Sequence, residues 1–187
     1  MSTQFSSTLR ESATINLTDA VTMIVEDSPF VLKLTSSALA GFGIRSRFVC
    51  HKPEEAKAIL AETPVDLILV NCDLPGSGGY ELVKWLRRSG LQSNAYAPVI
   101  MTAAHMSSSG LARARDSGAS LVIVKPFSAL TLLERIVWAA RDARPFLEAN
   151  DYYGPDRRVK SLPLAGPDRR LSRTHGFPAP QAPGRDR

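Results

Sequence analysis

The segment VDLILVNCDLPGSGG, residues 65–79, joins a short apolar run to a turn rich in glycine and proline. A short apolar run bounded by turn residues is typical of a strand that is buried on both faces of a sheet. Four other runs of this kind occur in the chain. The predicted strands are Ala20–Val25, Ile44–Val49, Val65–Val70, Pro98–Met101 and Leu121–Val124.

Helical periodicities lie between these runs. The predicted helices are Ser28–Ala40, Pro53–Glu62, Tyr80–Arg88, Ser107–Asp116 and Ser128–Arg144. Strands that alternate with helices pair in parallel through right-handed crossovers. The sequence therefore predicts a doubly wound α/β fold with a five-stranded parallel sheet. In such a sheet the functional cleft lies at the carboxyl ends of the strands.

Composition divides the chain of 187 residues into three parts. We expect a disordered segment at 1–18, a folded domain at 19–144 and a tail rich in Arg, Pro and Gly at 145–187. Residues 151–187 hold 8 basic and 4 acidic residues and few large apolar side chains. Such a segment cannot bury enough surface to offset its conformational entropy, so we predict that it is disordered until a ligand binds.

Several protein classes are excluded at this stage. No apolar run approaches the ~18–20 residues of a membrane span, and the N-terminus lacks the pattern of a signal peptide. Cys50 and Cys72 are too few for a disulfide framework, and both lie in apolar surroundings as small buried hydrophobes do. We therefore expect a cytoplasmic protein with no membrane insertion.

Polar residues follow the predicted strands. Strand one leads into Glu26-Asp27-Ser28-Pro29, strand three into Asn71-Cys72-Asp73-Leu74-Pro75-Gly76, strand four into Thr102-Ala103-Ala104 and strand five into Lys125-Pro126-Phe127. This combination resembles the CheY-like receiver domains of response regulators over roughly residues 19–144. In that family an acid pair holds Mg²⁺, a carboxylate on strand three accepts a phosphoryl group, and a hydroxyl and a lysine grip it.

The resemblance implies positions for each of these roles. Glu26 and Asp27 are the acid pair and Lys125 is the lysine, but the acceptor position holds Asn71, 44 residues after Asp27. Counting back from Lys125 places the hydroxyl position at Ala103, and Val122 stands where an aromatic residue often lies. An amide oxygen forms no stable acyl phosphate, so we expect a vestigial pocket and no enzymatic activity.

Alternatives for this pocket remain. Asp73 could accept the phosphoryl group, although it lies in the loop beyond the strand. Thr102 could replace Ala103 if strand four were shifted by one residue, although such a slip turns a side chain to the other face of the sheet. Glu26, Asp27 and Lys125 form either an ion-paired structural cluster or a weak residual Mg²⁺ site, with no other metal or cofactor expected.

The tail contains a repeat. Tyr153-Gly154-Pro155-Asp156-Arg157-Arg158 is followed twelve residues later by Ala165-Gly166-Pro167-Asp168-Arg169-Arg170. Arg donates two parallel hydrogen bonds to guanine O6 and N7, and Asp accepts from the opposite edge of the same base. The second Arg can stack on a base or pair with a phosphate. Two units predict a ligand with two guanines and two phosphates, which cyclic di-GMP provides.

A receiver-like domain with paired GPDRR units resembles the Cle group of CheY-like cyclic-di-GMP effectors. The resemblance implies a ligand dimer held by the repeat residues, ligand-dependent docking to the flagellar motor switch, and recruitment to the flagellated pole. The implied ligand-binding residues are Tyr153, Asp156, Arg157, Arg158, Asp168, Arg169 and Arg170. Two alternatives stay open: a phosphorelay adaptor, and a nucleic-acid-binding adaptor, against which the repeated aspartates count because they repel phosphates.

Overall fold

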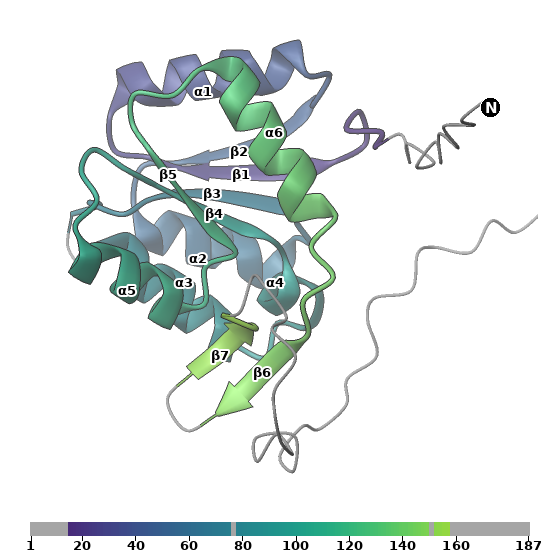
Figure 1. The fold of residues 1–187 in the computed structure, drawn as a ribbon. Helices are drawn as coiled ribbons and strands as arrows, with labels where there is room; N and C mark the ends of the chain where they lie inside the picture. The colour runs from purple at the N-terminus through teal and green to yellow at the C-terminus, as the bar shows by residue number, and fades with distance from the viewer. Residues whose placement is uncertain (1–14, 76–77, 150–151, 158–187) are drawn as a thin grey trace, which may run out of the picture.

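The computed structural model describes residues 15–75, 78–149 and 152–157. Five parallel strands form one sheet in the order β2-β1-β3-β4-β5, which confirms the predicted α/β fold (Figure 1). The strands are β1 (Val21–Val25), β2 (Ser46–Cys50), β3 (Leu67–Asn71), β4 (Val99–Ala103) and β5 (Leu121–Val124). The helices are α1 (Pro29–Gly41), α2 (Pro53–Glu62), α3 (Gly78–Arg88), α4 (Gln92–Tyr96), α5 (Ser108–Ser117) and α6 (Ala129–Ala140).

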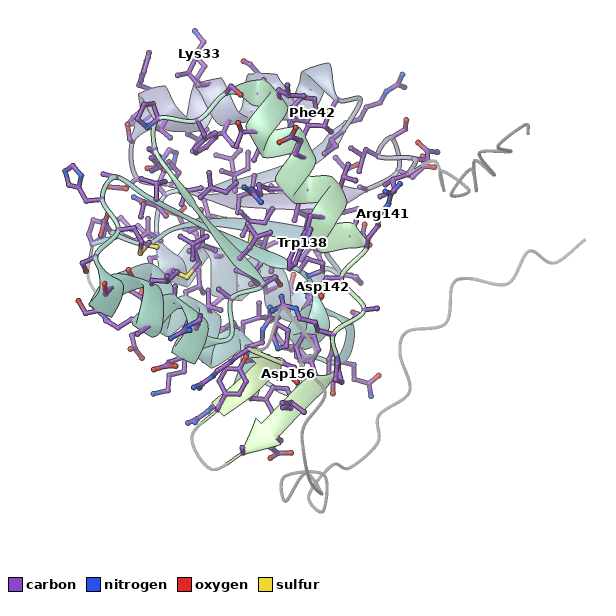
Figure 2. The ribbon with its side chains drawn as sticks, in the orientation of Figure 1. Lys33, Phe42, Trp138, Arg141, Asp142 and Asp156 are labelled. Atoms are coloured by element: carbon purple, nitrogen blue, oxygen red, sulfur yellow. The ribbon has the colours of Figure 1, made fainter. Side chains whose placement is uncertain are left out.

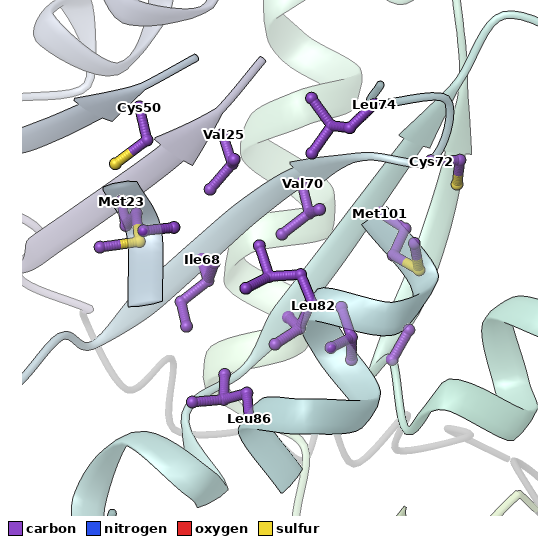
Figure 3. Packing of buried hydrophobic residues seen from close by; sticks show 14 of the residues in the cluster. Met23, Val25, Cys50, Ile68, Val70, Cys72, Leu74, Leu82, Leu86 and Met101 are labelled. Carbon is purple, nitrogen blue, oxygen red and sulfur yellow. The ribbon is translucent and has the colours of Figure 1, made fainter. Parts of the chain in front are cut away.

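Helices cover both faces of the sheet and enclose two apolar cores. Alternate residues of each strand point to opposite faces, so each central strand contributes to both cores. Met23, Val70 and Leu82 belong to the core beneath α2, α3 and α5, part of which Figure 3 shows. Ile24 and Ile136 belong to the core beneath α1 and α6. This packing fixes the strand ends, and therefore the side chains that follow them.

Serine side chains begin three of the helices. The hydroxyl of Ser28 accepts a hydrogen bond from the backbone N–H of Val31, and Ser107 and Ser128 do the same at the start of α5 and α6. Such caps satisfy backbone donors that the first turn of a helix leaves unpaired. They also hold the loops after β1, β4 and β5 at the carboxyl edge of the sheet.

The structure corrects the predicted C-terminal boundary. Helix α6 ends at Ala140, not at residue 144, and the chain then forms an antiparallel hairpin of β6 (Phe146–Ala149) and β7 (Tyr152–Pro155). The start of the expected disordered tail is thus ordered. The hairpin packs through β7 against α3 and α5, and Tyr152 is only 9% exposed. Burial of the apolar and aromatic side chains of the hairpin offsets the conformational entropy that this segment loses when it becomes ordered. The tail as a whole has too few such side chains to do the same.

The first GPDRR unit begins inside this hairpin. Gly154 and Pro155 of this unit are both buried residues of β7. Gly154 lies against Gly118, the left-handed residue that ends α5 at φ 93°. A Cβ added at Gly154 would lie 2.7 Å from the Cα of Gly118. The hairpin therefore depends on two glycines that let two backbones meet.

We expect Gly154→Ala to loosen the hairpin from the domain. Overpacking of a tight contact costs about 1–3 kcal/mol, so amide hydrogen exchange at 146–155 is expected to accelerate. Gly41→Ala is the matched control, because a Cβ at Gly41 has no atom within 4 Å. Equal protection of the hairpin in both variants and the wild type would contradict the docking contact.

Candidate functional site

The pocket at the carboxyl edge of the sheet brings together four of the predicted residues. Glu26 and Asp27 follow β1, Asn71 ends β3, and Lys125 follows β5. Glu26 and Asn71 are buried, whereas Asp27 is exposed. The Nζ atom of Lys125 lies 2.7 Å from Oε2 of Glu26 and forms an ion pair with it. Topology thus collects residues that are up to 99 positions apart in the sequence.

The side chain of Asn71 joins the acid pair to the lysine. Its amide nitrogen donates to Oδ1 of Asp27 at 2.9 Å and to Oε1 of Glu26 at 3.3 Å. Its amide oxygen accepts from Nζ of Lys125 at 3.3 Å. A neutral amide therefore bridges groups of opposite charge, and it gives Asp27 a hydrogen-bond donor, while Glu26 forms the ion pair with Lys125.

The arrangement fits Mg²⁺ poorly. A magnesium site needs several oxygen ligands in octahedral geometry. Here Asn71 turns the N–H groups of its amide toward both carboxylates, and Glu26 is neutralised by Lys125. Two carboxylates that face a donor rather than a third oxygen favour the ion-paired structural cluster over a residual Mg²⁺ site.

Strand register bears on the choice between Ala103 and the alternative, Thr102, for the hydroxyl position. Strand pairing places Thr102 beside Asn71, so both side chains lie on one face of the sheet. Ala103 is fully buried in the opposite core, beneath α2, α3 and α5. Thr102 therefore lies on the face of the sheet that carries Asn71, as the alternative assignment requires, and Val122 packs against the opposite core.

The described residues of the first repeat unit, 153–157, lie in and directly after the hairpin. The guanidinium of Arg157 lies 4.0 Å from the ring centroid of Tyr152, and its Nη1 lies 3.0 Å from Oδ1 of Asp116 on α5. The backbone of Asp156 donates to Pro145 and accepts from Arg144. Arg158, Asp168, Arg169 and Arg170 lie outside the described residues.

Tyr153 takes part in hairpin packing. Its hydroxyl lies 2.7 Å from that of Tyr96, and its ring belongs to an aromatic cluster with Tyr96 and Phe146. Burial and the hydrogen bond with Tyr96 raise the pKa of Tyr153 to about 12. The structure therefore gives this residue a structural contact in addition to the predicted ligand contact.

Sequence analysis gave no role to Arg87, which lies near the end of α3. The residue is 2% exposed, and its guanidinium donates to the backbone carbonyls of Gly118, Ala95 and Ala97. Burial lowers the pKa of Arg87 to about 10. The group ties α3 to the segments on which the hairpin rests. No sequence signal distinguishes it from the neighbouring Arg88.

The described residues contain no helix long and apolar enough to cross a membrane. Within the same residues, no three or more His, Cys, Asp or Glu side chains gather as metal ligands would.

Known proteins of similar sequence have the same kind of fold. The family model of the response regulator receiver domain matches residues 22–137. The phosphate regulon transcriptional regulatory protein PhoB of Pseudomonas aeruginosa is 29% identical over 123 residues, which cover 66% of this chain and 52% of PhoB. Chemotaxis protein CheY-3 of Vibrio cholerae is 25% identical over 114 residues, which cover 61% of this chain and 86% of CheY-3. Histidine kinase 1 of Arabidopsis thaliana is 31% identical over 75 residues, 40% of this chain and 6% of the kinase.

The chain thus spans about half or less of the length of the first curated relatives it matches, PhoB and Histidine kinase 1. Solved structures agree on the fold. Chemotaxis protein CheY4 of Vibrio cholerae superposes with a TM-score of 0.60 at 25% identity and covers 64% of this chain and 98% of CheY4. A CheY-like receiver domain protein of Methanospirillum hungatei gives a TM-score of 0.59 at 23% identity over 65% of this chain and 93% of that protein.

Proposed function

Because the chain belongs to the family of response regulator receiver domains, we propose that it is a signalling protein that responds to cyclic di-GMP instead of phosphorylation. Receiver domains are in general signalling modules that act through protein partners. The observation that carries the proposal is the tandem GPDRR repeat, in which each unit has the side chains that read one guanine and one phosphate.

Loss of the phosphorylation switch is the second part of the proposal. It is supported by Asn71, whose amide takes the place of the acceptor carboxylate and already bonds to Glu26, Asp27 and Lys125. A carboxylate forms an acyl phosphate because it is a negatively charged oxygen nucleophile, and an amide oxygen is not. In this proposal the tail, and not the pocket at the strand ends, receives the signal.

Energetics sets the expected stoichiometry. Ordering residues 154–170 costs ~1–2 kcal/mol per residue, less what the prolines and the docked start of the segment already restrict. Six polar side chains alone barely offset this cost, and micromolar binding needs a further ~8 kcal/mol. Stacked bases of two ligand molecules supply additional contact. We therefore propose that the tail binds an intercalated dimer, two ligands per chain.

Docking to the flagellar motor switch is the proposed output. The relative CheY-3 is a chemotaxis protein, which is consistent with motility as the process concerned. The surface formed by α5, β5 and α6 carries exposed apolar side chains, Leu111 at 44% and Val124 at 47%. Because the hairpin adjoins this surface, a tail that becomes ordered on ligand binding can change what the surface presents to a partner.

A calorimetric titration of the full chain with cyclic di-GMP, with GMP as the control ligand, tests the proposed function. We expect saturable binding of two cyclic di-GMP molecules per chain and no comparable heat with GMP. Absence of binding at tens of micromolar would refute the proposal. One ligand per chain would refute the dimer alone.

Asp116 competes with the ligand for Arg157 in this account. The two side chains are 57% and 44% exposed, and an exposed ion pair contributes only ~0.2–1 kcal/mol. We expect Asp116→Asn to tighten cyclic-di-GMP binding by about two- to fivefold, because Arg157 no longer has to leave a carboxylate. Asp19→Asn, the same charge change at an exposed site before β1, controls for net charge. Weaker binding by the Asp116 variant than by the control would count against a competing role for this pair.

A further inference from the structure

A cavity of about 310 Å³ lies where the hairpin meets the domain. Side chains from α5, β5, α6 and β7 line it. Its apolar wall includes Leu121 and Val122 of β5, Trp138 of α6 and Tyr152 of β7. Figure 2 shows Trp138 near the end of α6, with Asp142 and Asp156 close to the start and the end of the hairpin. The cavity exists only because the hairpin is docked, so sequence patterns of the domain alone do not reveal it.

Four arginines line this cavity, and none of its lining residues in the described part of the chain is acidic. Two of them are paired: Arg144 donates to both carboxylate oxygens of Asp142, and Arg157 pairs with Asp116. The other two, Arg115 on α5 and Arg135 on α6, are exposed and have no ion pair within the part of the chain that the structure describes. An apolar wall with a rim of unneutralised guanidinium groups suits a planar base that carries a phosphate.

The repeat reaches the mouth of this cavity. Pro155 and Arg157 of the first GPDRR unit are among its lining residues, and Arg158 of the same unit is the next residue in the chain. A ligand held by the first unit is therefore kept close to the cavity, because the unit is part of the chain that lines it, and this raises the effective concentration of the ligand there. The position of Arg157 links a tail that reads guanine to a basic pocket of the folded domain.

We propose that this cavity binds one guanine nucleotide moiety of the cyclic dinucleotide that the tail holds, with Arg115 and Arg135 contacting its phosphates. The inference rests on the proposed function and adds to it a contribution from the receiver domain. The cavity is at the lower end of the ~300–1,000 Å³ range of ligand pockets, which suits one moiety of the ligand and leaves the others to the tail. Binding in this position also fixes the ligand against α5, β5 and α6.

Paired substitutions in the full chain test the inference. Arg115→Gln with Arg135→Gln removes both unneutralised rim charges without creating a cavity, because both side chains are exposed. Arg45→Gln with Arg113→Gln is the matched control: both are exposed, neither lines the cavity, and the change in net charge is the same. Calorimetry with cyclic di-GMP is expected to give at least about tenfold weaker binding for the rim variant and less than about twofold for the control.

Trp138 supplies a second readout. The chain has two tryptophans, Trp85 and Trp138, so Trp85→Phe leaves Trp138 as the single reporter at the cavity wall. Addition of cyclic di-GMP is expected to change its fluorescence at the same midpoint as the calorimetric titration. In the rim variant the fluorescence change is expected to shift to the same higher ligand concentration as the heat.

Outcomes separate this inference from the function on which it rests. If both double variants weaken binding equally, the effect is one of overall charge, and the inference is wrong. If neither weakens binding and Trp138 does not respond, the tail binds alone, and the inference is wrong while the function stands. If the wild type binds no cyclic di-GMP, the proposed function fails, and the inference fails with it.

Discussion

Replacement of Asp168 and Arg169 by alanine is expected to abolish cyclic-di-GMP binding, with a loss of at least about 100-fold in affinity. The reason is chemical: in the proposed function, Arg169 and Asp168 of the second unit read the two edges of one guanine. A bidentate Arg–guanine pair contributes ~1–3 kcal/mol, and the carboxylate adds bonds to the N1–H and amino groups. Loss of one unit also removes half of a clamp whose two halves share the entropy cost of ordering.

The far end of the tail offers a matched control. Arg185→Ala with Asp186→Ala removes the same two residue types from the same segment, outside the repeat. We expect this variant to bind as the wild type does. Circular dichroism is expected to give the same thermal transition for all three chains. Equal binding by the Asp168/Arg169 variant and the wild type would refute the assignment of the second unit as a guanine reader.

Replacement of Asn71 by aspartate is expected to restore a phosphoryl acceptor. The wild type should gain no mass with a small-molecule phosphodonor and Mg²⁺, whereas the variant should gain one phosphoryl group. A carboxylate at this position supplies the missing nucleophile and a third negatively charged ligand for Mg²⁺, beside Glu26 and Asp27. Intact-mass spectrometry measures the outcome, and Asn71→Ala is the control that adds no carboxylate.

The same variant has a measurable cost without metal. Three carboxylates in one pocket repel one another, and Lys125 neutralises only one of them. We therefore expect Asn71→Asp to melt at a lower temperature than the wild type in a chelator and to regain stability with Mg²⁺, since metal binding to the native state adds to its stability.

Strand register leads us to expect different effects of substitutions at Thr102 and Ala103 in the Asn71→Asp chain. Thr102 lies beside position 71, whereas Ala103 is buried in the opposite core. Thr102→Val is therefore expected to slow phosphorylation of the Asn71→Asp chain, while Ala103→Ser is not expected to speed it. A mass gain in the unmodified wild type would contradict the proposed loss of the switch, and its disappearance in Asp73→Asn would locate the acceptor at Asp73.

The fold was predictable because the relevant signals are local. Runs such as Leu121–Val124 and helices such as Pro53–Glu62 have the same bounds in the structure as in the prediction. Ser28 and Ser128 mark helix starts through bonds to residues three positions away. The short helix α4 escaped notice because its five residues give no apolar periodicity.

The missed features depend on contacts between distant segments. The hairpin is stable because Tyr152 and Gly154 meet α3 and α5, and tail composition gave no sign of those contacts. Pairing of β3 with β4 decides which side chain of β4 lies beside Asn71, and a count along the chain does not show this pairing. The network of Glu26, Asn71 and Lys125 was within reach of sequence analysis because parallel strands end at the same edge.

The central claim is that the tail recognises guanine bases and not merely a cyclic phosphate backbone. Side-by-side calorimetric titrations of the full chain with cyclic di-GMP and cyclic di-AMP test it most directly, because the two ligands share their phosphates and differ in their bases. The account predicts binding of cyclic di-GMP at least about 100-fold tighter than that of cyclic di-AMP, because adenine lacks the O6 acceptor for Arg and the N1–H for Asp. Equal affinities for the two ligands, falling together as salt is raised, would contradict it.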